Sequence, residues 1–171
     1  MIYTLLEPKH PLLHSPLPEI TADTEPEDRK EILDNMIESM KHYGGIGLSA
    51  NQVGIALRMF VFGDSKNYIP CFNPKILEYG GPEVAIEEGC LTYPGLFVKI
   101  YRPEWIVAVW EDENRELHKE NFTGLQSRVF QHEYDHMQGI DFRSLAGRMA
   151  LNIAKRKLKK GQRRLKKMRE E

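Results

Sequence analysis

The chain has 171 residues and a formal net charge of −1, with 41% hydrophobic and 29% charged residues, which is ordinary for one globular domain with a real core. No apolar run approaches the roughly 20 residues needed to cross a bilayer, two cysteines are too few for a disulfide framework, and residues 1–8 lack the basic region of a secretory signal. We therefore expect a cytoplasmic monomer with no membrane association.

A helix is predicted in the segment that ends at Gly44. Thr24 is a suitable N-cap, and Ile32, Met36 and Met40 recur at the four-residue spacing that places side chains on one helical face. Glycine is the preferred residue just after a helix, so Gly44 is expected to end it.

The glycine-rich segment that follows, residues 44–54, carries no charge. Its backbone amides could bind a substrate, and Gln52 could donate an amide hydrogen to a carbonyl oxygen or an oxyanion. The alternative is a plain helix cap followed by a turn, which a G-x-G run often marks.

Three later segments are predicted to be strands. Residues 57–62, apolar except for Arg58, and the apolar run 106–110 are two of them. Residues 117–122 follow a charged turn at 112–114 and are expected to form an edge strand. Together with the predicted helices, these strands indicate an α+β fold.

The two cysteines lie in different settings. Cys71 lies in an apolar run, 68–72, and is interpreted as a core thiol. Cys90 lies in residues 87–95, where two glycines and a proline interrupt regular structure, and a thiolate there could bind zinc or iron. The alternative for Cys90 is a half-buried loop cysteine without a ligand role.

The most informative motif is H-E-x-x-H at residues 132–136, inside a segment, 129–137, that is predicted to be helical. Residues four apart share a helical face, so His132 and His136 can offer two imidazole nitrogens to one metal ion. Glu133 could reach a water on that ion without binding the ion itself. The motif therefore predicts a hydrolytic metal centre.

Two histidines leave a catalytic metal one protein ligand short. Downstream of His136 there is no further histidine, Phe142 stands where one metalloprotease pattern has its third ligand, and Asp141 is too close along the chain to fold back easily. The third ligand is therefore expected upstream. The upstream candidates are His10, His14, His42, His118, Cys71, Cys90 and several carboxylates. His10 and His14 lie in a proline-containing turn, which disfavours them.

The C-terminal segment is strongly basic. Residues 1–147 hold 13 basic and 23 acidic side chains, a net charge of −10, whereas residues 148–171 hold 11 and 2, a net charge of +9. We expect a catalytic domain, 1–147, and a basic extension of it, 148–171, whose helix docks its first turns and projects the rest. Such a helix can bind RNA phosphates. The alternatives are a solvated charged helix and a membrane surface, the latter disfavoured by an apolar stripe that is thin beyond Leu158.

Three motifs occur in one order: G-x-G-L-x-A-N-Q at 45–52, E-G-C-L-T at 88–92 and Q-H-E-x-D-H-x-x-G at 131–139. Together they resemble the peptide deformylase family, and the H-P-x-L segment at 10–13 is similar to its early motif. The resemblance implies mixed or antiparallel sheets packed around the H-E-x-x-H helix, with a C-terminal helix. It implies a hydrolase that removes the formyl group from the N-terminal formylmethionine of nascent polypeptides and releases formate.

The resemblance also implies a ligand set and its ion. Cys90, His132 and His136 would bind the metal, and Glu133 would be the general acid and base. Iron(II) is the implied native ion, while zinc, nickel and cobalt also suit a Cys-His-His set. For the basic helix, the implied partner is the ribosome, through its RNA.

Further residues are implied to handle the substrate. Gln52 and the backbone N–H of Leu91 would hold the formyl oxygen, and Glu88 and Arg102 would form a supporting ion pair. Ile46, Gly47 and Gly89 would pair with the substrate backbone. The methionine pocket would be lined by Ile46, Ile86, Leu125 and Val129, although any of these four taken alone could simply be core.

Two positions depart from the commonest pattern of the family. Ser49 stands where alanine is usual, and Thr92 where serine is usual. Both are small, but Ser49 could alter the hydrogen bonding near Gln52.

Two other functions are left open by the sequence. One is a metallopeptidase with a different third ligand, which would cleave internal peptide bonds without releasing formate. The other is a non-catalytic ribosome-binding module with a structural metal, which a closed four-ligand site would support.

Overall fold

The structure is a computed structural model that describes residues 1–64 and 66–170. Side chains are described for residues 1–64 and 66–168. Residue 171, the last of the predicted basic extension, lies outside the described residues. Five strands form one sheet in the order β1-β2-β3-β4-β5, and each neighbouring pair is antiparallel. They are β1 (Gly47–Ser49), β2 (Met59–Gly63), β3 (Tyr68–Gly89), β4 (Phe97–Glu111) and β5 (Leu117–Thr123). The α+β prediction is confirmed, and the sheet is antiparallel rather than mixed.

The predicted strands correspond to β2, β4 and β5, and the first begins two residues later than predicted. Residues 57 and 58 lie before β2, because the N–H of Met59 donates to the carbonyl oxygen of Leu57 in a tight turn at 2.8 Å. The edge position expected for residues 117–122 is confirmed, since β5 ends the sheet order.

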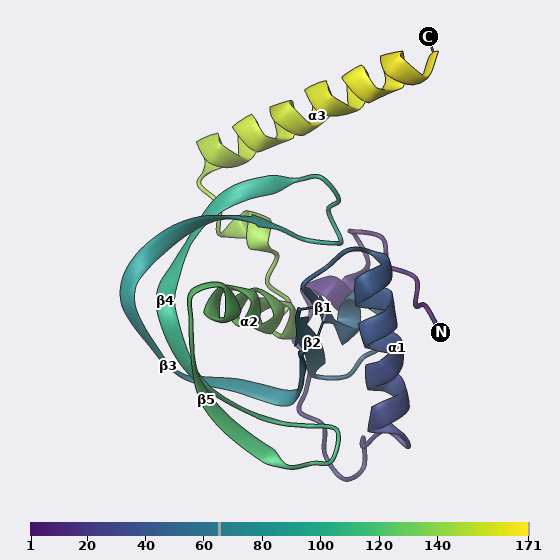
Figure 1. The fold of residues 1–171 in the computed structure, drawn as a ribbon, viewed down its shortest axis with the longest axis vertical. Helices are drawn as coiled ribbons and strands as arrows, with labels where there is room; N and C mark the ends of the chain where they lie inside the picture. Colours follow the sequence, from purple (N-terminus) through teal and green to yellow (C-terminus); the bar gives the residue numbers. More distant parts are fainter. Residues whose placement is uncertain (65, 171) are drawn as a thin grey trace.

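Strands β3 and β4 form a long hairpin that curls around the helix α2 (Gly124–Met137), as Figure 1 shows. The ladder between them has three register shifts. At the third, Gly80 lies against the indole of Trp105, where a Cβ atom would come within 2.0 Å of the ring, and Gly81 has a φ of +74°. Bulges and glycines bend a strand, so the end of β3 returns over α2. The predicted break in regular structure at 87–95 therefore begins only at Cys90.

Helix α2 is held in place by an aromatic core on one of its faces. The ring of Phe130 lies 5.0 Å from that of Phe60, 5.8 Å from that of Phe62 and 5.4 Å from that of Phe122. All four rings are buried at 2% exposure or less. The packing fixes α2 against the sheet and thereby fixes the direction of its other face, which carries the H-E-x-x-H motif.

Helix α1 (Arg29–His42) starts later than the sequence predicts. Its N-cap is Asp28, whose carboxylate accepts a hydrogen bond from the N–H of the third helical residue at 2.9 Å. Thr24 was the wrong N-cap, because its hydroxyl accepts the N–H of Thr21 in a turn that precedes the helix. Gly44, with a φ of +69°, follows the last turn as predicted.

The basic segment forms α3 (Arg148–Glu170), and its helical prediction is confirmed over the described residues. Ala154 is buried, and Leu151 and Leu158 pack with it on a small apolar cluster, which we call the Leu96 cluster, while the rest of the helix projects from the body (Figure 1). The other buried members of this cluster are Cys90, Leu96, Val98, Ile100 and Phe142. The short 3-10 helices are η1 (Pro11–His14), η2 (Ala50–Val53) and η3 (Phe142–Ser144). In the part of the chain that is described, none of the helices combines the length and apolarity that crossing a bilayer requires.

Candidate active site

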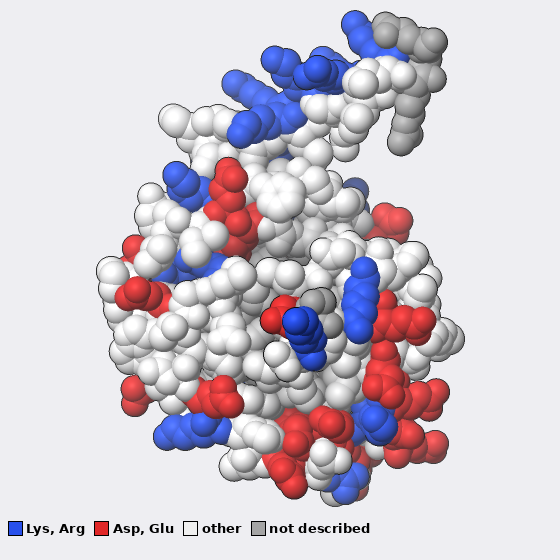
Figure 2. Space-filling model, in the orientation of Figure 1, with Lys and Arg blue, Asp and Glu red and all other residues white. Residues whose placement is uncertain are grey.

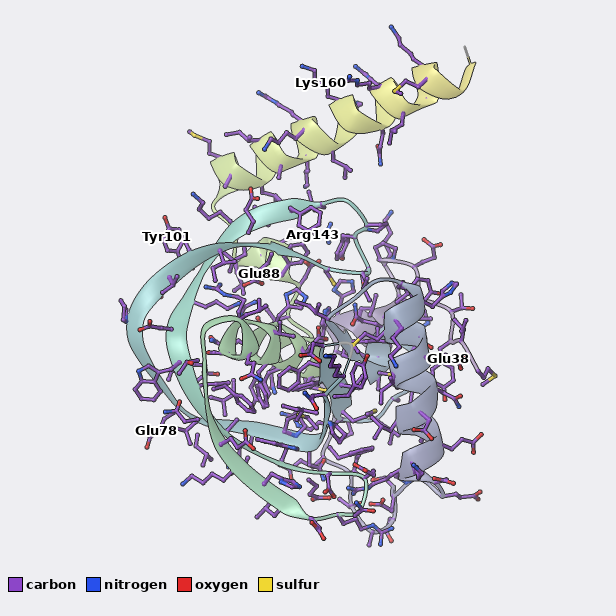
Figure 3. All side chains as sticks on the ribbon, in the orientation of Figure 1. Glu38, Glu78, Glu88, Tyr101, Arg143 and Lys160 are labelled. Atoms are coloured by element: carbon purple, nitrogen blue, oxygen red, sulfur yellow. The ribbon has the colours of Figure 1, made fainter. Side chains whose placement is uncertain are left out.

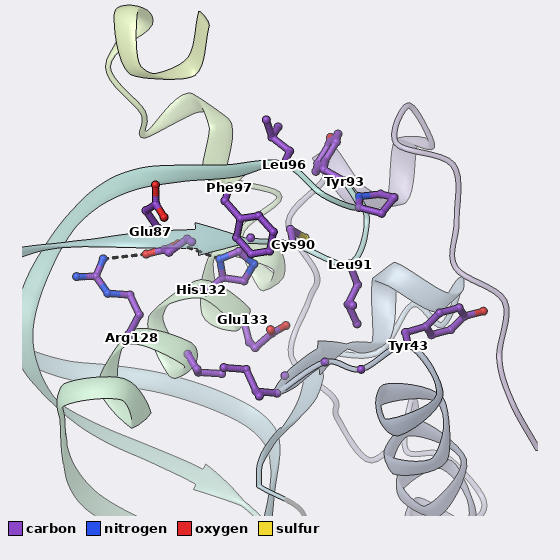
Figure 4. A pocket seen from close by; sticks show the side chains of 18 of the residues that line it. Tyr43, Glu87, Cys90, Leu91, Tyr93, Leu96, Phe97, Arg128, His132 and Glu133 are labelled. Atoms are coloured by element: carbon purple, nitrogen blue, oxygen red, sulfur yellow. Dashed lines mark hydrogen bonds and ion pairs between the residues drawn. The ribbon is translucent and has the colours of Figure 1, made fainter. Parts of the chain in front are cut away.

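Three segments that are distant in sequence line one cavity of about 500 Å³. They are residues 43–47 after α1, residues 86–97 around the β3–β4 turn, and the face of α2 that turns away from the aromatic core (Figure 4). The cavity therefore joins parts of all three sequence motifs.

Cys90, His132 and His136 meet beside this cavity, which the first two line. One ligand atom from each lies within 4.8 Å of the other two, and Sγ of Cys90 is 3.4 Å from Nε2 of His136. Their exposure is between 5% and 9%. The i, i+4 spacing on α2 brings the histidines together, and the turn after β3 adds the sulfur. The prediction that the third ligand lies upstream is confirmed, and Cys90 provides it.

The donor set fits a divalent transition metal. Burial by itself raises the pKa of the Cys90 thiol, but the charge and hydrogen bonds of His136 and His132 outweigh burial and lower that pKa well below its ordinary value. A thiolate with two imidazoles suits zinc, iron(II), cobalt or nickel. This is a metal-binding Cys-His-His site.

A buried carboxylate orients the first histidine. Oε2 of Glu88 lies 3.0 Å from Nδ1 of His132, so the other ring nitrogen is directed toward the ligand cluster. Arg102 makes the predicted ion pair with Glu88, at 2.6 and 3.0 Å, and Arg128 adds a contact at 2.8 Å. Figure 4 draws the line of contacts from Arg128 through the carboxylate to His132, and Figure 3 places Glu88 inside the curled hairpin. Burial opposes the charge on Glu88, but the hydrogen bonds from His132 and Arg102 lower its pKa well below the usual range.

The sequence reasoning missed two members of this network. Arg128 lies four residues before His132 and so shares its helical face. An arginine on that buried face needs a carboxylate partner, so its position could have indicated a role in this network. Asp135 contacts Arg102 at 2.7 Å from the opposite side of the guanidinium. Together the ionic contacts hold the H-E-x-x-H helix against the end of β3.

Glu133 lies against the glycine-rich segment. A Cβ atom on Gly47 would come within 2.4 Å of Oε1 of Glu133, so only glycine allows this approach. Among the described residues, Oε2 of Glu133 is the one buried side-chain nitrogen or oxygen without a hydrogen-bond partner. Burial raises the pKa of this carboxyl to about 7. A buried acceptor left open beside a cavity is costly unless another group, such as a water or a substrate, satisfies it.

Gln52 is aimed at the ligand cluster by its neighbours. The Ser49 hydroxyl donates to Oε1 of Gln52 at 2.9 Å, and the Ser49 N–H donates to the same atom at 3.0 Å. The amide nitrogen of Gln52 therefore faces the other way, donating to the hydroxyl of Thr92 at 3.0 Å and to Sγ of Cys90 at 3.4 Å. Both departures from the family pattern thus take part in positioning this amide, as expected for Ser49.

The four apolar residues expected at a methionine pocket all line the cavity. Ile46 and Leu125 are 51% and 62% exposed, so neither is a core residue. Ile86 is half-buried. Val129 is buried and belongs to the aromatic core cluster as well, so it both lines the cavity and packs in the core.

Other candidate ligands lie elsewhere. His10 and His14 are exposed around η1, where Nε2 of His14 bonds the carbonyl oxygen of Pro8 at 2.8 Å. Cys71 is fully buried in the core, as predicted. Asp141 is engaged by Tyr93, whose hydroxyl donates to it at 2.7 Å. None of these four belongs to a group of possible ligand atoms among the described residues.

Comparisons with known proteins agree with this geometry. Residues 2–148 match the family model described as polypeptide deformylase. A peptide deformylase of Thermotoga maritima is 41% identical over 114 residues, covering 67% of this chain and 70% of that protein. Its family includes a chloroplastic/mitochondrial peptide deformylase 1B of Arabidopsis thaliana, 37% identical over 122 residues, covering 68% of this chain and 44% of that one.

Solved structures are similar over nearly the whole fold. The crystal structure of the Thermotoga maritima enzyme has a TM-score of 0.81 at 35% identity, covering 86% of this chain and 99% of that chain. A peptide deformylase from Synechococcus elongatus, in complex with actinonin, has a TM-score of 0.83 at 31% identity, covering 91% of this chain and 85% of that chain.

The fold and its buried ligand set define a metal-dependent hydrolase that acts on an amide. Within that class, the chain belongs to the polypeptide deformylase family. Its activity is the removal of the N-formyl group from nascent peptides. Of the functions that the sequence left open, this assignment replaces both the metallopeptidase and the non-catalytic ribosome-binding module.

Proposed function

We propose that Glu133 carries the proton in this deformylation, while Cys90, His132 and His136 hold the ion. The observation that supports the role of Glu133 is its open Oε2, buried beside the ligand cluster with no partner among the described residues. An acceptor in that position can bind the attacking water. The other oxygen, Oε1, lies close beside Gly47, where only glycine leaves room for it.

The ion we propose is iron(II), and zinc, nickel or cobalt would fit the same donors. When bound, such an ion lowers the pKa of a coordinated water toward neutrality and polarises a neighbouring carbonyl oxygen. Elemental analysis of protein purified without oxygen identifies the ion. Iron in one equivalent supports the proposal, and zinc alone would contradict the choice of ion without changing the residue roles.

The proposed proton path needs one carboxylate. Glu133 accepts a proton from the water whose oxygen forms the new bond to the formyl carbon. The carbon–nitrogen bond then breaks, and Glu133 passes the proton to the leaving nitrogen. The second proton of the water stays with the acid, so the products are formic acid, which ionises to formate in solution, and a free N-terminal amine; atoms and charge balance with one water consumed.

Gln52 and the backbone N–H of Leu91 are proposed to hold the formyl oxygen. An amide nitrogen carries two hydrogens, so Gln52 can keep its bond to Thr92 while the hydrogen now facing Sγ of Cys90 turns to the substrate. Within the described part of the chain, the Leu91 N–H has no acceptor. Loss of one donor of this kind typically raises the barrier by about 2.7–4 kcal/mol.

The substrate backbone is proposed to pair with Ile46, Gly47 and Gly89, and its methionine to fill the pocket formed by Ile46, Ile86, Leu125 and Val129. An open sheet edge supports this assignment. Residues 83–89 of β3 pair with β4 on one side, while β2 pairs only with residues 68–72, so among the described strands the other edge has no partner. An extended peptide can add to such an edge as a further strand.

Residues 148–171 are proposed as a basic extension of the catalytic domain, 1–147, that binds ribosomal RNA. Figure 2 shows lysines and arginines on the outer side of α3 and acidic side chains gathered at the far end of the body. Deletion of 148–171 is expected to spare hydrolysis of short peptides and to weaken co-sedimentation with ribosomes, most clearly at low salt. We still predict that the protein is monomeric and cytoplasmic. Sedimentation tests the oligomeric state, and cell fractionation tests the location.

Glu133→Gln tests the central role. The variant keeps the shape of the side chain but cannot take up the proton, so formate release from a formyl-Met peptide should fall by roughly 10²–10⁴-fold while metal content stays the same. Glu87→Gln, which neutralises an exposed glutamate on the same cavity, is the matched control and should change little. Near-normal turnover by Glu133→Gln with full metal content would contradict the proposal.

A further inference from the structure

A second hollow, of about 660 Å³, lies between α3 and the outer side of β4. We call it the α3 groove, and its apolar walls come from Phe97 and Val98 of β4 and from Ile153, Leu158 and Leu165 of α3. It adjoins the catalytic cavity, because Glu87, Gly95 and Phe97 line both. The ring of Phe97, 59% exposed, lies at the junction of the two.

The underside of α3 carries an apolar stripe that is longer than its contact with the body. Ala150, Ala154 and Leu158 pack in the Leu96 cluster. Leu165 lies two helical turns, seven residues, after Leu158, and Met168 follows three residues later, so both continue the stripe, yet they are 60% and 65% exposed. Figure 2 shows white side chains on the side of α3 that faces the body and blue ones on the other, where Figure 3 places Lys160. The projecting turns therefore hold an apolar face over the groove.

Gly161 leaves room in the middle of this face. It lies inside α3, where glycine is disfavoured relative to alanine. A Cβ atom there would meet nothing within 4 Å, so no contact within the body requires the glycine. Its effect is to keep the wall of the groove open between Leu158 and Leu165, both of which line it.

We propose that the α3 groove binds the downstream part of the formylated nascent chain itself, as an extended segment with apolar side chains. The inference rests on the proposed function, since it takes the chain that begins in the catalytic cavity and follows it outward past Phe97. The shared lining of the two hollows supports this occupant, because a polypeptide longer than the cavity has to leave it. Apolar walls suit apolar side chains, and Lys99 and Lys157 at the rim suit a chain with acidic or neutral neighbours.

The proposal predicts that substrate length matters only when the added residues are apolar. A formyl-Met tripeptide is compared with a longer peptide that continues with leucine and phenylalanine, and with an equally long one that continues with serine and glycine. The apolar peptide should have a kcat/KM roughly tenfold above that of the tripeptide, mainly through KM, a factor that corresponds to the burial of about two methylene groups. The serine–glycine peptide should match the tripeptide.

Two variants locate the effect in the groove. Leu165→Glu places a charge on its wall, and Gly161→Leu fills its middle without adding charge; both should abolish the tenfold advantage and leave tripeptide kcat/KM unchanged. Met149→Glu is the matched control, because this 78% exposed residue lies on the same helix outside the groove. It should retain the advantage.

The outcomes separate the possibilities. An advantage that persists in both groove variants, or that is absent from the wild-type enzyme, overturns the proposal. An advantage that disappears at high ionic strength also overturns it, because the longer peptide would then be held by the lysines. A concentration-dependent dimer that Leu165→Glu abolishes overturns it as well, because the groove would then bind a second copy of the chain. Failure to hydrolyse the tripeptide at all would instead count against the proposed roles of the catalytic residues.

Discussion

Two histidine–carboxylate pairs of this protein have the same separation and different surroundings. Nδ1 of His132 lies 3.0 Å from Glu88, and Nε2 of His118 lies 3.0 Å from Asp112 in the turn between β4 and β5. Glu88 is buried between two arginines, whereas the side chain of His118 is 37% exposed and stacks on Trp110. The distance alone therefore does not distinguish a functional pair from a structural one.

Each pair also adjoins a triplet of possible ligand atoms within 4.8 Å of one another, the Cys-His-His set at the active site and Asp112, Glu116 and His118 at the turn. In the turn, Oδ1 of Asp112 accepts the N–H groups of Asn114 and Glu116, so the carboxylate already shapes the backbone. At the active site, Oε2 of Glu133 is open beside a cavity. An unsatisfied buried atom is what separates the two clusters.

The largest expected effect tests this difference on metal content. Cys90→Ala removes one of three buried ligands, so the purified protein should lose nearly all of its bound metal, and activity with it. Asp112→Ala should leave one equivalent of metal in place. Elemental analysis, with circular dichroism to confirm that each variant is folded, makes the measurement. Equal metal loss in both variants would mean that the turn binds an ion as well.

A smaller effect concerns stability. Glu88→Gln leaves the guanidinium of Arg128 buried without its carboxylate, and breaking a buried ion pair in this way costs about 3–5 kcal/mol of unfolding free energy. Asp112→Asn breaks a partly exposed pair and should cost less than about 1 kcal/mol. Urea unfolding of the two variants beside wild type gives both values. A Glu88→Gln protein as stable as Asp112→Asn would show that the network adds orientation but no stability.

The parts of the site that follow from spacing were predictable from the sequence. The i, i+4 histidines on α2 converge because helical geometry is local. Cys90 lies 42 residues before His132, so spacing alone could not pair them; the family resemblance supplied Cys90 and the Glu88–Arg102 ion pair. The strand cores were predictable for the same reason, since apolar runs are visible without knowledge of their partners.

The remaining features depend on contacts that no short window contains. The N-cap of α1 is Asp28 rather than the predicted Thr24, because the threonine hydroxyl accepts a hydrogen bond in a turn that precedes the helix. The length of β3 and its curl depend on bulges and on Gly80 lying against Trp105 across the ladder. Arg128 could have been found from its shared face with His132, but its partner on β3 could not.

The smallest effect is a pH dependence confined to the exposed pair. Burial raises the pKa of Asp112, but hydrogen bonds from His118 and from the N–H groups of Glu116 and Asn114 outweigh burial and lower it below its ordinary value. A carboxyl with a lowered pKa in the folded state stabilises the protein above the pKa of the unfolded state, about 3.9, and loses that contribution as the pH falls through the folded-state value. The difference in unfolding free energy between wild type and Asp112→Asn should therefore be present at mildly acidic pH and shrink toward zero in stronger acid. A difference that grows in acid would mean that the aspartate is stabilised in its protonated form, which would remove the turn as an ionic counterpart of the buried site.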